Sequence, residues 1–119
     1  ARMALSALYA NPSRLEPAMV GPFREEAVAQ ARRLSFRDFL RAEVAPTGFR
    51  SWLGPRLPDL TRPVFFVHGQ KDRLVPVQHG RRAARLVPQA ELWTPWAGRW
   101  PMRELPGPFA DRVTRFLQA

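Results

Sequence analysis

The chain has 119 residues with 45% hydrophobic and 11% aromatic side chains, which suits one modest globular domain and excludes a disordered tail. It contains no cysteine, so disulfide scaffolds and cysteine-based metal or thiol chemistry are excluded. The net charge is +9, and all but one of the 19 lysine and arginine residues are arginine. These arginines are scattered singly or in pairs, without a clustered run or an aromatic stacking platform. We therefore expect a solvated basic surface and no nucleic-acid binding.

The sequence carries no signal for a membrane or for export. No run approaches 18 consecutive apolar residues, and Pro12 interrupts the opening segment before a signal-peptide pattern is complete. We therefore expect a soluble, cytoplasmic protein without membrane contact. The first residue is Ala1 and not methionine, which favours a piece of a longer protein or a processed form.

Amphipathic helical spacing characterises the first part of the chain, from about residue 12 to residue 46. Two or three short helices are expected there. Ser13 and Ser35 stand in positions suited to N-caps, and Asp38 would complete a capping box with Ser35. The apolar positions that repeat every three or four residues are Val20, Phe23, Ala27 and Ala31, and they are followed by Leu34, Phe36, Phe39 and Leu40.

A segment rich in proline and glycine follows, over residues 46–63. It predicts an irregular connector with one helical turn around residues 49–53. We therefore divide the chain into a helical segment with its connector, residues 1–60, and a second unit, residues 61–119.

The second unit has the pattern of a parallel strand-helix-strand crossover. Residues 63–67 are a continuous apolar run of β-formers that ends before Gly69, which predicts a strand buried on both faces. A helix over residues 77–87 and a second short strand over residues 90–95 follow, and this spacing predicts parallel strands. The closing segment predicts a helix that packs on them. Its apolar stripe consists of Phe109, Val113, Phe116 and Leu117.

Two strands alone make an incomplete sheet. They cannot bury both faces and both edges, and an exposed parallel edge invites pairing with another chain or self-association. From the residues alone we therefore predict an α/β architecture that is part of a larger sheet, with two parallel strands and packed helices after a helical segment. A partner chain that completes the sheet stays open as an alternative to a missing part of the same polypeptide.

The second unit resembles the C-terminal part of α/β-hydrolases. The stretch RPVFFVHGQKDRLVP, a helix, LVPQAELWTPWAG and WPMRELPGPFADRVTRFL are similar to their penultimate strand, acid-bearing loop, helix, last strand, histidine-bearing loop and final helix. The residues before about residue 55 resemble, more loosely, the helical cap that such enzymes insert. The resemblance implies a partial α/β-hydrolase fold and a complete parent that hydrolyses ester, epoxide or similar bonds in small, mainly apolar substrates. The sequence has no phosphate loop, metal-ligand spacing or cofactor fingerprint, so we expect no cofactor and no metal ion.

Asp72 and Arg99 occupy the two positions of this pattern that carry chemistry. Asp72 follows Gly69 in the Gly-x-x-Asp turn that holds the acid of the family's catalytic triad; the alternative is a turn aspartate that caps its own loop. Arg99 stands where the family has the catalytic histidine, in AGRWPMRELP. A guanidinium stays protonated and has no acceptor lone pair. Arg99 can therefore form an ion pair with Asp72 but is not expected to act as a general base.

The remaining site predictions concern the walls of a substrate pocket. His68 ends the first strand and is expected to line the mouth of the site, while Trp100 and Met102 flank the histidine position and are expected in the cavity wall. His79 is expected to face solvent, and neither histidine replaces the missing one. Apolar residues of the first segment either line the pocket of a cap or form plain core. They are Met19, Phe23, Phe36, Phe39 and Trp52.

The nucleophile of the family is missing from the sequence. Its motif is Gly-x-Ser-x-Gly, and no such pattern surrounds Ser6, Ser13, Ser35 or Ser51. Because the nucleophile precedes the acid and the histidine in the family's chain order, it belongs upstream of this sequence. We therefore predict the C-terminal part of a hydrolase, inactive as this chain, and keep a non-catalytic interaction module as the alternative.

Overall fold

The second unit is built around two parallel strands, β3 (Val64–Val67) and β4 (Ala90–Trp93), which form one sheet in register from Val64 opposite Ala90 to Val67 opposite Trp93. The structure is a computed structural model that describes residues 2–51 and 53–119, without the side chains of residues 33 and 35. Helix α4 (Val77–Leu86) connects the two strands, as the spacing predicts. The sequence therefore predicted both strands, their direction and the connecting helix.

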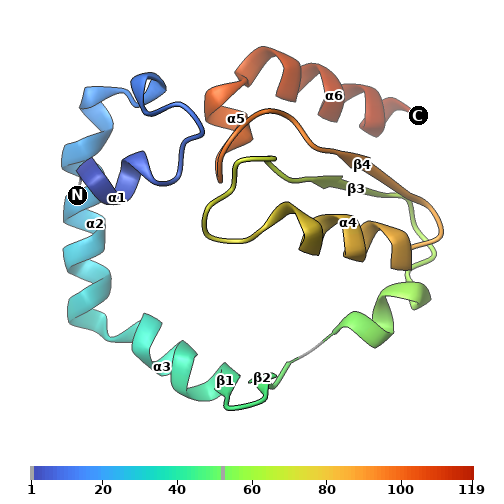
Figure 1. Cartoon of the computed structure of the whole chain (residues 1–119), viewed down its shortest axis with the longest axis horizontal. Helices are drawn as coiled ribbons and strands as arrows, with labels where there is room; N and C mark the ends of the chain where they lie inside the picture. Colours follow the sequence, from blue (N-terminus) through green and yellow to red (C-terminus); the bar gives the residue numbers. More distant parts are fainter. Residues whose placement is uncertain (1, 52) are drawn as a thin grey trace.

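Helix α6 (Pro106–Gln118) packs on the face of the sheet opposite to α4, so the strands lie between the two helices (Figure 1). Aromatic pairs make this contact: Phe65 stacks on Phe116 with ring centroids 5.3 Å apart, and Trp93 lies 6.5 Å from Phe109. Leu117 does not belong to the buried stripe, because 75% of it is exposed. The stripe therefore follows the three- and four-residue spacing of Phe109, Val113 and Phe116 and ends there.

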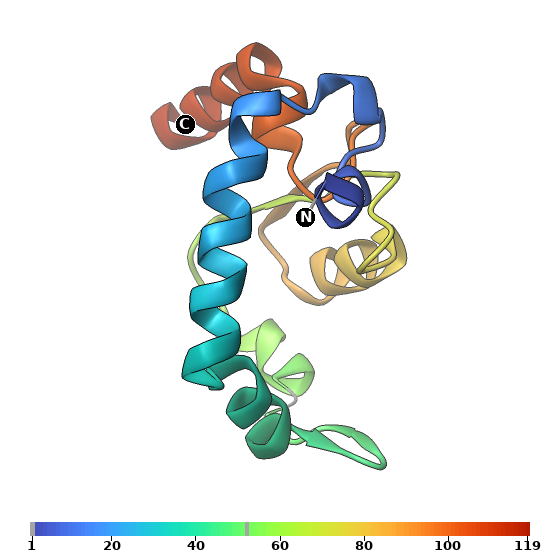
Figure 2. The ribbon, with the colours of Figure 1, turned by 90° about the vertical axis from the view of Figure 1, so that its left-hand side faces the viewer.

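The first part of the chain forms an arc of helices that leaves the sheet and returns to it (Figures 1 and 2). Its longest helix, α2, has 14 residues, and no helix of the described chain combines the length and apolarity needed to cross a bilayer. The arc ends at η3, which packs on α4. Its elements are α1 (Arg2–Ser6), η1 (Pro12–Arg14), η2 (Pro17–Met19), α2 (Val20–Arg33), α3 (Ser35–Glu43), β1 (Val44–Ala45), β2 (Gly48–Phe49) and η3 (Gly54–Asp59).

The helix starts differ from the predicted caps. Leu34, with φ of 54°, separates α2 from α3 and takes the N-cap position of α3, so the capping box at Ser35 is wrong. Ser13 lies inside η1, where the side chain of Asn11 accepts from its backbone N–H. The helical turn of the connector lies in η3 and not over residues 49–53, because Pro55 supplies the preset φ of a first helical turn.

The best buried side chains lie where the start of the chain meets the loop after β4. Leu5 and Tyr9 are almost completely buried, as is Ala97 in that loop. The Tyr9 ring meets Trp100 edge to face at 6.0 Å. Residues 2–11 therefore share a core with the second unit, while the boundary near residue 60 stays a prediction.

The chain is expanded for its size. Its radius of gyration is 16.6 Å, whereas a compact domain of this length has about 13.5 Å. Its accessible surface of 8968 Å² exceeds by roughly 2,400 Å² the roughly 6,600 Å² expected for a compact monomer of this mass. The sheet residues are accordingly half-buried in β3 and half-buried or exposed in β4, because the described chain lacks the neighbouring strands and layers that would cover them.

Candidate functional site

Asp72 lies in the loop that leaves the C-terminal end of β3. The loop turns through Gly69, whose carbonyl accepts from the Asp72 N–H at 3.2 Å. Gly69 is required there, since a Cβ at this position would overlap the backbone of Ala97 and Gly98. This close approach of the two loops brings Asp72 next to the loop after β4.

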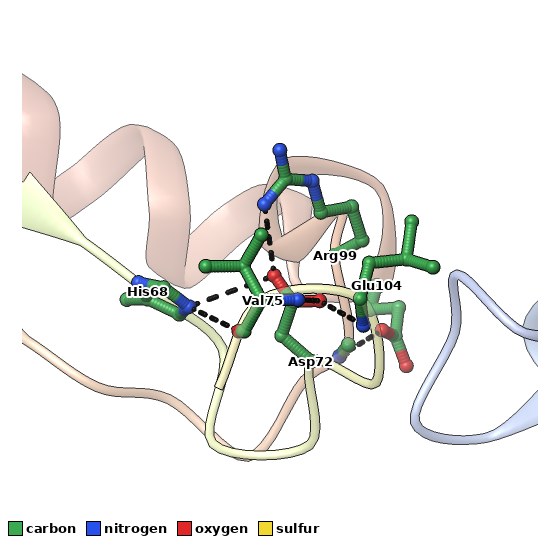
Figure 3. A network of polar contacts seen from close by, with 7 residues as sticks. His68, Asp72, Val75, Arg99 and Glu104 are labelled. Carbon is green, nitrogen blue, oxygen red and sulfur yellow. Dashed lines mark hydrogen bonds and ion pairs between the residues drawn. The ribbon is translucent and has the colours of Figure 1, made fainter. Parts of the chain in front are cut away.

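The Asp72 carboxylate is buried and held at both oxygens (Figure 3). Oδ1 accepts from the backbone N–H groups of Leu74 and Val75, at 2.9 and 3.0 Å. Oδ2 accepts from Nη1 of Arg99 at 3.1 Å. Burial by itself raises the pKa of this carboxyl, but the two backbone donors and the guanidinium outweigh burial and hold the pKa below its ordinary value. Asp72 is therefore ionised at neutral pH.

Arg99 reaches Asp72 from the loop after β4. Its backbone N–H donates to the carbonyl of Leu8 at 2.6 Å, which fixes the start of the side chain. The side chain is 43% exposed, and it makes one hydrogen bond to the described residues, the one to Asp72. The structure thus brings together the two residues that the sequence placed at the acid and histidine positions.

His68 is pinned and does not replace a catalytic histidine. Its Nε2 lies 2.8 Å from the carbonyl of Val75, which can only accept, so Nε2 carries the proton. The same atom lies 3.6 Å from Oδ2 of Asp72. The Nδ1 side of the ring packs so closely on Gly80 that a Cβ there would overlap it. Neither ring nitrogen is therefore free to take a proton from a substrate.

These residues surround a pocket of about 300 Å³, which we call the Asp72 pocket. Trp100 and Met102 line it together with His68, and their role in binding a substrate stays a prediction. His79 is exposed and lies elsewhere, on α4. The full lining is Val67, His68, Gly69, Asp72, Arg99, Trp100, Pro101 and Met102.

The apolar residues predicted as possible cap lining do not reach the Asp72 pocket. Met19 and Phe23 are half-buried near the start of the helical arc. Phe36 and Phe39 stack on each other at 6.4 Å and remain 67% and 49% exposed. Trp52 lies outside the described residues. Among the described residues, therefore, the lining of the pocket comes from the second unit.

Glu104 is a site residue to which the sequence analysis gave no role. It is 4% exposed, and its carboxylate accepts from the backbone N–H groups of Gly98 at 2.5 Å, Ala10 at 3.0 Å and Asn11 at 3.2 Å. The Glu104 carbonyl accepts in addition from the Arg14 side chain. Glu104, labelled in Figure 3, therefore fastens the loop that carries Arg99 to the start of the chain through its hydrogen bonds to Ala10 and Asn11.

Among the residues and side chains that the structure describes, neither a serine nucleophile nor a metal cluster accompanies this pair. No serine lines the Asp72 pocket, and the hydroxyl of Ser6 donates to the carbonyl of Arg2 within α1. Within residues 2–51 and 53–119, no group of three or more potential metal ligands comes together. The described site thus consists of a held carboxylate, a cation and an apolar wall.

Comparison with solved structures identifies the fold. A serine hydrolase involved in carbazole degradation matches 98% of the chain with a TM-score of 0.80 and 23% identity. Two α/β-hydrolases from metagenomes also match. The one from sediments of the Mar Chica lagoon, Morocco, matches 78% of the chain with a TM-score of 0.63 and 23% identity. The one from the deep-sea Medee basin matches 97% of the chain with a TM-score of 0.58 and 17% identity. No family model matches the sequence, and no curated protein matches it significantly.

The chain therefore has a partial α/β-hydrolase fold. It spans 45%, 43% and 42% of the three matched proteins, less than half of each. At sequence identities of 17–23% the similarity shows the fold, whereas the chemistry depends on the residues of the site.

Proposed function

We propose that this chain is the C-terminal part of an α/β-hydrolase whose complete form hydrolyses ester, epoxide or similar bonds in small, mainly apolar substrates. The observation that supports the proposal most directly is the 3.1 Å contact between Asp72 and residue 99, across the loops that follow the two strands. A triad acid and its histidine require this arrangement, because the carboxylate must hold the imidazole and stabilise it once it is charged. Trp100, Met102 and Val67 supply an apolar wall beside it.

As it stands, the chain is not a hydrolase. General-base catalysis needs a group that takes a proton from the nucleophile and returns it to the leaving group. Arg99 cannot do so, since a guanidinium remains protonated and offers no lone pair. The ion pair with Asp72 preserves the geometry of the acid and histidine positions without their proton transfer.

We expect the purified chain to show no turnover of p-nitrophenyl acetate or butyrate above the buffer rate. Asp72→Ala should leave that rate unchanged, because Asp72 alone does not activate water. Product release at 400 nm measures the rate, and circular dichroism confirms that both proteins are folded. Turnover above the blank that disappears in Asp72→Ala would contradict the inactive part of the proposal.

The second candidate function is a non-catalytic module that completes its sheet with another chain. Two observations favour it: the excess of roughly 2,400 Å² of accessible surface, and the pairing of β3 with β4 alone among the described strands. An excess of this size matches a large protein interface.

If the module hypothesis holds, size-exclusion chromatography with light scattering should give a mass above the 13.6 kDa of the monomer, rising with concentration. Phe66→Lys, in β3, should shift the protein toward the monomer, because a charge on this strand opposes its pairing with, and burial by, a second chain. A monomer at all concentrations that unfolds cooperatively would argue against this candidate.

A further inference from the structure

We propose that the Asp72 pocket is a binding site for a small organic carboxylate with an apolar body, and that Arg99 is the residue that recognises the carboxylate. The site needs only the pocket, so the proposal does not depend on a nucleophile or on the hydrolytic history of the fold.

The side chain of Arg99 has unused hydrogen-bonding capacity. A guanidinium carries five N–H donors in a planar fork. One N–H donates to Asp72, and no other hydrogen bond or ion pair joins the Arg99 side chain to the described residues. The side chain is 43% exposed and lines the pocket, so the remaining donors are accessible to a ligand. A planar fork with one occupied edge is the geometry that binds a carboxylate through two parallel hydrogen bonds.

Asp72 holds the guanidinium in place and occupies only one of its N–H donors. Two of the three hydrogen bonds that the Asp72 carboxylate accepts come from the backbone of its own loop, through Oδ1. Only Oδ2 faces Arg99, at 3.1 Å. Asp72 therefore orients Arg99 and reduces the entropy that the side chain would lose on binding a ligand.

The charged groups around the pocket leave Arg99 available to an anion. Glu104, the nearest further carboxylate of the loop, is buried and turned toward the backbone N–H groups of Gly98, Ala10 and Asn11. His68 donates a hydrogen bond from Nε2 to the carbonyl of Val75. The chain as a whole carries a net charge of +9, which attracts small anions at low ionic strength.

The lining and the volume of the pocket suit the apolar body of such an acid. Trp100, Pro101 and Met102 line the pocket beside Arg99, and Met102 is 45% exposed. The volume of about 300 Å³ accommodates an aromatic or short aliphatic acid but not a long chain. A pocket that is lined both by a cation and by aromatic and thioether side chains fits a compact amphipathic acid such as benzoate.

Benzoate is the probe for the test, and benzamide is its neutral analogue of the same shape. Titration of the full chain at low ionic strength, followed by ¹H–¹⁵N NMR, should give saturable shifts at residues 68–72 and 98–102 with a dissociation constant of roughly 1–10 mM. Benzamide should bind at least about tenfold more weakly, because it lacks the charge that pairs with Arg99. Equal binding of the two compounds, or no saturable shift with benzoate, would overturn the proposal.

Arg99→Gln should weaken benzoate binding by at least about tenfold, and Arg99→Lys by a smaller factor, since lysine offers a point charge without the planar fork. Arg73→Gln is the matched control, because it removes the same charge from an exposed residue next to Asp72 that does not line the pocket. Arg73→Gln should change the affinity by less than about twofold. If the two glutamine variants weaken binding equally, the effect is diffuse charge and the proposed site is wrong. Thermal unfolding identifies a misfolded Arg99→Gln protein, and Arg99→Lys then decides, because it must still bind more weakly than wild type.

Discussion

Replacing Glu104 by alanine should destabilise the chain by about 3–4 kcal/mol, or detach residues 2–11 from the rest of the fold. Three backbone N–H groups, those of Gly98, Ala10 and Asn11, donate to this one buried carboxylate. Removing it leaves all three without their acceptor, and each unsatisfied buried donor costs about 1–3 kcal/mol, with water relieving part of the cost. Few other side chains of the chain are as well buried, so little else compensates for the loss.

Urea unfolding measures the loss of stability, and native-state amide exchange at Ala10, Asn11 and Gly98 shows where it occurs. Glu104→Gln should fall between alanine and wild type, since its amide oxygen still accepts while its NH₂ faces backbone donors. Glu91→Ala is the control. It removes an exposed carboxylate on β4 whose side chain makes no hydrogen bond to the described residues, and it should cost less than about 0.5 kcal/mol. If Glu104→Ala and Glu91→Ala unfold at the same urea concentration, Glu104 does not fasten the loop.

This network marks the limit of what the sequence could predict. Strands β3 and β4 and helix α4 were predictable because each is encoded by a local pattern, an apolar run or an amphipathic repeat. The meeting of Asp72 and Arg99 was predictable as well, since parallel strands end at the same edge of a sheet and both residues follow strand ends. Glu104 was visible in the motif, but two of its donors lie more than 90 residues away in the chain. No local pattern encodes such a contact.

The wrong predictions for the first part of the chain have a different cause. The left-handed conformation of Leu34 could not be predicted from the sequence, because leucine has no preference for it. Phe36 and Phe39 follow a correct helical spacing, yet both remain exposed among the described residues. The periodic pattern therefore predicted the helix but not the burial, which depends on the rest of the sheet and its layers.

The largest effect is expected when the missing part of the fold is supplied. A chimaera that joins the N-terminal part of the carbazole-degradation serine hydrolase to this chain would combine that enzyme's unmatched portion with Asp72 and residue 99. With Arg99 we expect no esterase activity above the blank. With Arg99→His we expect kcat/KM for a p-nitrophenyl ester to rise by about 10²–10⁴-fold, because imidazole can accept the proton of the nucleophile and Asp72 can hold its tautomer.

Two further variants separate this explanation from a general effect of adding histidine. Arg73→His, a change of the same kind at an exposed residue outside the Asp72 pocket, should give no gain. Asp72→Asn in the Arg99→His chimaera should remove most of the gain, since an amide no longer stabilises the charged imidazole. Cooperative thermal unfolding must first show that the chimaeras are folded. If a folded Arg99→His chimaera is as inactive as its arginine parent, then the pairing of residues 72 and 99 is not that of a triad, and Asp72 is a loop-capping aspartate whose partner is arginine for structural reasons.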